Sequence, residues 1–85
     1  MASPKYKVYK GSEYVGCAKY AEDAAALVAL QEDGSVRLLH KYVLWTQGVD
    51  GDAGESYDAA AELMHQRERE VNEKAYAKVY GRQSA

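Results

Sequence analysis

Aromatic and basic side chains alternate near the start of this sequence, and they are its best candidates for chemistry. The segments Lys5–Lys10 (KYKVYK) and Glu13–Tyr20 (EYVGCAKY) place tyrosines beside lysines. Tyrosine rings stack on nucleobases while lysine and arginine bind phosphate, and tyrosine and arginine are also enriched at protein interfaces. The ligand-binding set that this pattern predicts is Lys5, Lys7, Tyr9, Tyr14, Arg37 and Tyr42.

Two short motifs are similar to parts of metal sites, but neither is complete. Asp50-Gly-Asp52 matches the start of a calcium loop, whose twelfth position should be a bidentate glutamate and is Ala61 here. Glu62 and His65 have the Glu-x-x-His spacing of di-iron helices, which also need a second such motif and two further glutamates. The sequence therefore predicts no metal and no cofactor, unless an oligomer assembles Glu62 and His65 from several chains.

Nucleophilic catalysis and phosphate-loop chemistry find no support either. The lone Cys17 has only His40 and His65 as possible partners, and neither histidine has a neighbour in the sequence that would make it a general base. The glycine-rich segment Gly48–Glu55 precedes a helix, but it lacks the lysine of a phosphate-binding loop and its carboxylates repel phosphate. We therefore predict no catalytic residue and no enzymatic activity.

The composition indicates one small folded domain that acts in the cytoplasm. The chain has 85 residues, 47% of them hydrophobic and 28% charged, with a net charge of −2 that disfavours binding to long DNA or RNA. A single cysteine cannot form an internal disulfide. The longest apolar run, Ala24–Leu30, is far shorter than the roughly 20 residues of a membrane span, and Met1–Lys10 contains no apolar signal segment.

Four strands are expected to position these side chains. Lys5–Lys10 and Glu13–Tyr20 form a hairpin around Gly11-Ser12, which directs Tyr6, Val8, Val15 and Cys17 to the core. Ser35–Gln47 forms a second hairpin with a turn at His40-Lys41, and one continuous strand with a bulge is the alternative. In this hairpin Val36, Leu38, Val43 and Trp45 are core residues, and Arg37, Leu39, Tyr42 and Leu44 lie on the opposite face.

Two helices complete the prediction. Ala21–Glu32 is rich in alanine, has acidic residues in its first turn and is followed by Gly34, and Leu27, Val28 and Leu30 are its buried residues. Ser56 caps a long helix over Tyr57–Tyr80 that ends at Gly81. Its first half has a core-facing stripe of Tyr57, Ala60, Ala61, Leu63 and Met64. Its second half has only a thin stripe of Val71, Ala75 and Val79, so we expect that part to project from the domain and contact another chain.

The predicted fold class is therefore α+β, in the order ββαββα, with a four-stranded, mainly antiparallel sheet, one short helix and one long C-terminal helix. Residues 5–80 form a single domain in this scheme. Residues 1–4 and 81–85 are expected to be flexible termini.

The stretch Tyr6–Arg67 resembles small accessory proteins of tailed phages that infect actinobacteria. The similarity lies in KVYKGSEYVG, KYAEDAAALVAL, YVLWTQG and AGESYDAAAELMHQR. The resemblance implies a viral protein in the cytoplasm of a host cell, where such small proteins commonly bind a host protein or counter a host defence. It implies no particular site residue.

These observations together favour a non-enzymatic interaction protein. It would form a homodimer or a higher homo-oligomer and bind a host macromolecule, without any membrane association. Its predicted interface residues are Tyr9, Tyr14, Tyr42, Leu44, Val71, Ala75 and Val79. The alternative is a module that binds a small nucleotide or a nucleic acid through the tyrosine-rich, basic face of the sheet.

Overall fold

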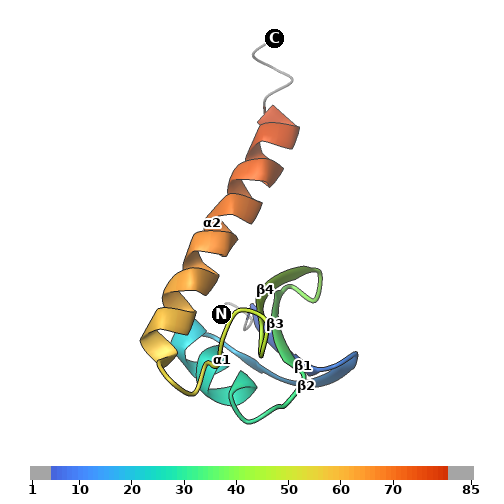
Figure 1. Cartoon of the computed structure of the whole chain (residues 1–85). Coiled ribbons are helices and arrows are strands. Elements are labelled where there is room, and N and C mark those ends of the chain that lie inside the picture. Colours follow the sequence, from blue (N-terminus) through green and yellow to red (C-terminus); the bar gives the residue numbers. More distant parts are fainter. Residues whose placement is uncertain (1–4, 81–85) are drawn as a thin grey trace.

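The α+β fold predicted from the sequence is confirmed, in the order ββαββα (Figure 1). A computed structural model describes the backbone of residues 5–80 and the side chains of residues 5–75, so the expected flexible termini lie outside the described residues. The elements are β1 (Tyr6–Lys10), β2 (Glu13–Ala18), α1 (Ala21–Val28), β3 (Gly34–Leu38), β4 (Tyr42–Thr46) and α2 (Tyr57–Tyr80).

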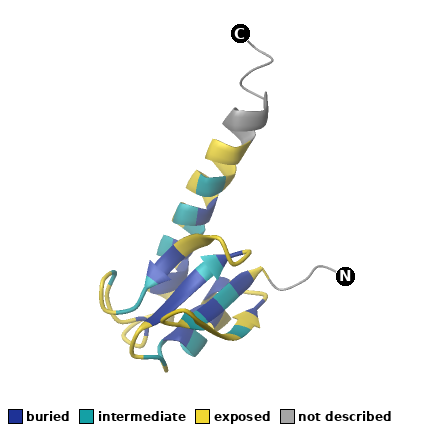
Figure 2. Cartoon of the chain, turned by 90° about the vertical axis from the view of Figure 1, so that its right-hand side faces the viewer, coloured by how far each residue is buried: buried dark blue, intermediate teal, exposed yellow. Residues whose placement is uncertain are grey.

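The four strands form one antiparallel sheet in the order β2-β1-β3-β4, so the two hairpins lie side by side with β1 and β3 in the middle. Both helices cover the same face of this sheet. Helix α1 packs on β1, β2 and β3, while α2 packs on α1 and on β4. Figure 2 views the molecule from the right-hand side of Figure 1, with the sheet in front, the helices behind it and α2 rising above. We call the uncovered side the open face.

The first hairpin turns at Gly11-Ser12 as predicted, but its register shifts between Val8 and Tyr9. Tyr9 pairs with Tyr14 and Val8 pairs with Gly16, so Val15 is an extra residue in a β-bulge. Beyond the bulge each side chain of β2 moves to the opposite face. Two predictions are therefore wrong: Val15 and Cys17 are exposed, and Ala18 takes the place expected for Cys17 in the core.

The second hairpin differs from its prediction in the same way. Its tip has positive φ at Leu39 and His40, one residue earlier than expected, and the register shifts between Val36 and Arg37 so that Leu44 is the extra residue. Leu44 is therefore fully buried under α2, whereas Val43 lies opposite Arg37 and is 50% exposed. The expected roles of Val43 and Leu44 are thus reversed, while Val36, Leu38 and Trp45 belong to the core as predicted.

Helix α1 is shorter than expected because the chain must return to the sheet. It ends at Val28, and the following turn is closed by hydrogen bonds from Leu30 to Leu27 and from Gln31 to Val28. Leu30 consequently faces solvent, with 78% of its surface exposed. Alanines make up much of the buried side of both helices, so the backbones of α1 and α2 can approach each other and the sheet closely.

Helix α2 has the predicted boundaries, and Ser56 Oγ caps it by accepting a hydrogen bond from the N–H of Ala59 at 3.2 Å. Its buried side chains are Ala60, Ala61, Met64 and Glu68, while Tyr57 is exposed against expectation. Val71 is partly buried against the core, and every residue from Asn72 to Ala75 is exposed. We call residues 72–80 the distal arm; Figure 1 shows this last part of α2 extending well beyond the sheet.

Candidate interaction surfaces

The open face carries most of the aromatic and basic residues that the sequence singled out. Strand pairing aligns Tyr9 with Tyr14 and Lys7 with Arg37 and Cys17, and places Val43 beside Arg37. The side chains that the registers direct to the open face are Lys7, Tyr9, Tyr14, Cys17, Ser35, Arg37, Val43 and Thr46. The structure therefore gathers Lys7, Tyr9, Tyr14 and Arg37 of the predicted ligand-binding set.

These residues form a compact cluster around Tyr9. The guanidinium Cζ of Arg37 lies 4.4 Å from the centre of the Tyr9 ring, and the Tyr14 ring lies edge-on at 5.6 Å. His40, at the tip of the β3–β4 hairpin, approaches both rings, at 5.8 Å from Tyr9 and 5.3 Å from Tyr14, and its Nδ1 is hydrogen-bonded to the Tyr9 hydroxyl. Sequence reasoning missed His40 as a member of this cluster, because no periodic pattern shows that a hairpin tip bends over the sheet.

Three residues of the predicted surface lie elsewhere. Lys5 turns to the helical side and forms an ion pair with Glu68 of α2 at 2.6 Å. Tyr42 pairs with Leu38, whose side chain is in the core, so it lies at the helical side of the β4 edge. Leu44 is buried and cannot contribute to a surface.

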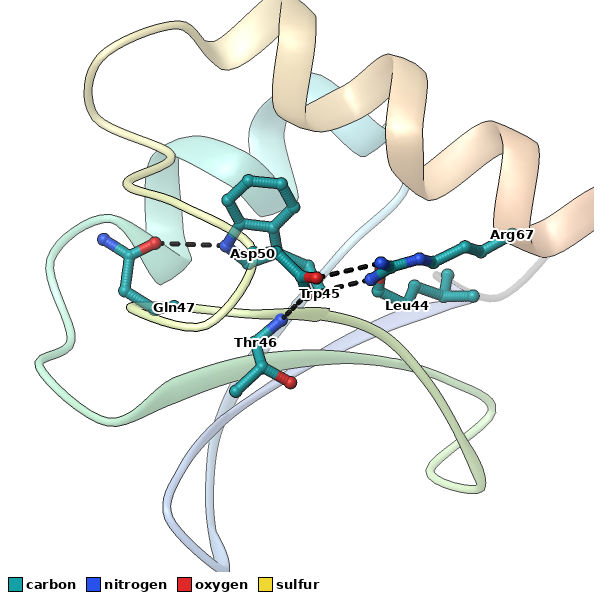
Figure 3. A network of polar contacts seen from close by, with 6 residues as sticks. All are labelled: Leu44, Trp45, Thr46, Gln47, Asp50 and Arg67. Carbon is teal, nitrogen blue, oxygen red and sulfur yellow. Dashed lines mark hydrogen bonds and ion pairs between the residues drawn. The ribbon is translucent and has the colours of Figure 1, made fainter.

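The base of the distal arm is held from the side of β4 (Figure 3). The two terminal nitrogens of Arg67 donate to the two carboxylate oxygens of Asp50 at 2.8 Å each, and Nη1 also donates to the carbonyl of Leu44 at 3.0 Å. Asp50 in turn accepts the backbone N–H of Thr46 at 2.7 Å. The hydrogen bonds from Arg67 hold the pKa of Asp50 below its usual value, against the opposing effect of burial.

The loop that carries Asp50 is itself fixed by a side-chain amide. Gln47 Oε1 accepts hydrogen bonds from the indole of Trp45 at 3.1 Å and from the N–H of Ala53 at 3.0 Å. Its Nε2 donates to Asp52 at 2.7 Å. The carboxylates that suggested a calcium loop are thus occupied by Arg67, Thr46 and Gln47, and they belong to the architecture of the fold.

The same point of α2 is held from the side of β1. The nearly buried carboxylate of Glu68 accepts hydrogen bonds from Lys5 at 2.6 Å and from the Tyr6 hydroxyl at 2.5 Å, and His65 Nδ1 lies 3.7 Å away. Burial would raise the pKa of Glu68, but the bonds from Lys5 and Tyr6 outweigh it and lower that pKa. Burial and the bond to Glu68 raise the pKa of Tyr6.

A shallow groove lies where the distal arm leaves the domain. It has a volume of about 260 Å³ and is lined by Tyr42, Val71, Lys74 and Ala75. The structure thus brings Tyr42, Val71 and Ala75 of the predicted interface to one place. Of the other predicted interface residues, Tyr9 and Tyr14 lie on the open face, Leu44 is buried, and the side chain of Val79 lies outside the described part of the chain.

A second cavity, of about 350 Å³, lies at the start of α1. It is lined by Lys5, Tyr6, Lys19, Tyr20, Ala21, Glu22 and His65. Glu22 and the neighbouring Glu68 balance the charges of Lys5 and Lys19, so this cavity has no net charge with which to select an ion. Within residues 5–75, no group of three or more His, Cys, Asp or Glu side chains is placed to hold a metal.

Comparisons with known proteins give no family assignment for this chain. No protein-family model matches the chain, and neither a curated protein nor a solved structure is significantly similar to it. In the described part of the chain, no helix combines the length and the apolar character needed to cross a membrane.

Proposed function

We propose that this chain is a non-catalytic interaction protein that pairs with a second copy of itself through the distal arm and the adjoining groove. The observation that carries this proposal is the contrast within α2. Charged hydrogen bonds fix Arg67 to Asp50 and Glu68 to Lys5, on two sides of the helix. One turn later, all residues from Asn72 to Ala75 are exposed. A firmly held base supports a rigid arm, and residues 72–80 extend it by about 13 Å at 1.5 Å per residue.

The charge distribution along α2 favours a second copy as the occupant of the groove. Residues 57–73 contain five acidic residues and two arginines, net −3, whereas residues 74–80 contain two lysines and no acidic residue, net +2. Two antiparallel copies of α2 therefore place the basic end of each helix beside the acidic part of the other. Antiparallel pairing also gives a two-fold symmetric dimer, the commonest homo-oligomer. The resemblance to small phage proteins favours a host macromolecule in the cytoplasm as the partner that this dimer binds.

Substitution of Ala75 tests the pairing. Ala75→Glu keeps helix propensity but adds a charge to the groove, so light scattering behind a sizing column should show a change from twice 9.4 kDa to 9.4 kDa. Leu30→Glu is the control, because Leu30 is 78% exposed and follows α1, outside both the groove and the acidic part of α2. A wild-type monomer at about 100 µM, where a weak but specific dimer would be populated, would refute the proposal, as would an Ala75→Glu dimer.

A further inference from the structure

We propose that the open face of the sheet binds a short stretch of single-stranded nucleic acid, with Tyr14 stacking on a base and Arg37 and Lys7 binding the neighbouring phosphates. This inference does not rest on pairing through α2, because the open face lies on the opposite side of the sheet from both helices.

The first support is the separation of charge between the layers. Within the strands, Glu13 is the only acidic residue, and it lies at the turn beside Lys10. Every other acidic residue of the sequence lies on a helix or in a connecting segment. The net charge of −2 therefore conceals a basic sheet beneath an acidic helical layer. A phosphate chain approaching the open face meets Lys7 and Arg37 and no carboxylate.

The second support is that Lys7 and Arg37 have no acidic partner among the described residues, in contrast to Lys5 and Arg67. The Arg37 guanidinium is nevertheless held in place, because it stacks on the Tyr9 ring. On the same face, Ser35 Oγ and Arg37 Nε are buried without a hydrogen-bond partner in the described part of the chain. Such atoms require an explanation in a native structure, and a bound polar group is one.

The third support is the backbone at the hairpin tip. Leu39 and His40 both adopt the left-handed conformation, with φ of 54° and 66°, which is unfavourable for residues other than glycine, asparagine and aspartate. This is the geometry of a type I′ hairpin turn, which has positive φ at both central residues, and the N–H of Lys41 closes the turn on the Leu38 carbonyl at 3.0 Å. Here it brings His40 against Tyr9 and Tyr14, so that the cluster has three aromatic rings and a half-exposed tyrosine, Tyr14, at its edge.

These features favour a nucleic acid over an acidic protein segment. Carboxylates of a peptide would be satisfied by the cations alone, whereas the cluster also offers rings to a flat aromatic partner. Single strands expose their bases for stacking, and double helices do not.

Fluorescence anisotropy with a fluorescein-labelled single-stranded RNA of about 12 nucleotides tests the inference at low salt. Tyr14→Ala should weaken binding at least about tenfold. Tyr57→Ala is the matched control, because Tyr57 and Tyr14 are both 47% exposed and Tyr57 lies at the start of α2. Equal affinity of the two variants, or no binding by the wild type, would overturn the proposal.

The salt dependence separates the roles of the cations. Two phosphate contacts to a single strand give a slope of log K against log salt of about −1.4, and Arg37→Ala should reduce its magnitude by about 0.7. Arg69→Ala, at an exposed arginine of α2, should leave the slope unchanged. If Arg37→Ala does not fold, Lys7→Ala provides the same reading. An unchanged slope in the variant used would contradict phosphate binding at the open face.

Two competitors identify the ligand class. Unlabelled RNA should displace the probe, while polyglutamate of equal charge and a mononucleotide should not. Displacement by polyglutamate would show a charge-driven site for acidic proteins, and displacement by the mononucleotide at the concentration of the RNA would show a nucleotide site. Either result would overturn the single-strand proposal. The Ala75→Glu variant should bind the RNA like the wild type, so failure of self-association leaves this test intact.

Discussion

Two consecutive side chains of α2 fix the helix to opposite sides of the domain. Neighbouring residues of a helix point about 100° apart, which lets Arg67 reach Asp50 and the Leu44 carbonyl while Glu68 reaches Lys5 and Tyr6. Each contact joins α2 to a different strand, since Lys5 precedes β1 and Leu44 belongs to β4. The orientation of the distal arm therefore depends on two polar contacts made within one turn.

The Asp50–Arg67 pair should contribute to stability in a pH-dependent way. Asp50→Asn should lower the free energy of unfolding at pH 7 by about 1–3 kcal/mol, a range that allows for the partial exposure of Arg67. Because the pKa of Asp50 is lowered in the folded state, this contribution is complete above its unfolded value near 3.9 and is lost as the pH falls through the folded value. Urea unfolding at pH 7 and at about pH 2.5 should show the difference from the wild type shrinking with acidification.

The control for this experiment is Asp33→Asn, since the Asp33 side chain is exposed and forms no hydrogen bond or ion pair with the described residues. Glu68 titrates in both proteins, so its contribution cancels in the comparison. A wild-type advantage of the same size at both pH values would mean that the ionic part of the pair adds nothing.

At the scale of elements, their type and order could be predicted from the sequence, while the strand registers could not. Alternation in Lys5–Lys10, alanine in α1 and the Ser56 cap are local signals, and each element they indicate is present. A bulge adds one residue to one strand, and the alternation of Glu13–Tyr20 reads equally well with or without it. Tyr9, Tyr14, Lys7 and Arg37 still share the open face, because Tyr9 and Tyr14 pair before the bulge and Lys7 and Arg37 lie on the strands that carry no extra residue, whereas Leu44 is itself the bulge residue.

The bulge in β2 makes a direct prediction about Cys17. The thiol should react with Ellman's reagent in the folded protein at a rate within about tenfold of the unfolded chain, because exposed thiols are readily attacked. Ala24→Cys in a Cys17→Ser background gives the buried comparison, since Ala24 is fully buried in α1. Protection of Cys17 until the protein unfolds would show that β2 keeps the regular alternation instead.

The close approach of α1 to β3 makes a second prediction at this scale. A Cβ at Gly34 would lie 2.7 Å from Val28 Cγ2 and 3.1 Å from the Val28 carbonyl, so Gly34→Ala should cost about 1–3 kcal/mol in the free energy of unfolding. Gly16→Ala should cost less than about 1 kcal/mol, because its Cβ meets only the flexible end of Leu27, at 3.2 Å. Thermal unfolding of both variants measures the two losses of stability. Equal losses would show that the contact of Gly34 with Val28 is no tighter than that of Gly16 with Leu27.

For the whole molecule, the proposed pairing makes the stability of the folded protein depend on its concentration. The described chain measures 46 Å along its long axis and 24 Å across, and α2 accounts for this elongation (Figure 1). If two copies pair through their distal arms, each tenfold rise in concentration stabilises the folded pair by about 1.4 kcal/mol. The Tm of the full chain should therefore rise by about 5 °C per tenfold increase in concentration.

A chain that ends at Asn72 keeps Val71 and both polar contacts of α2, so it should fold and melt at a Tm that does not depend on concentration. Differential scanning calorimetry over two decades of concentration distinguishes a Tm that depends on concentration from one that does not. A constant Tm for the full chain would show that the distal arms do not pair.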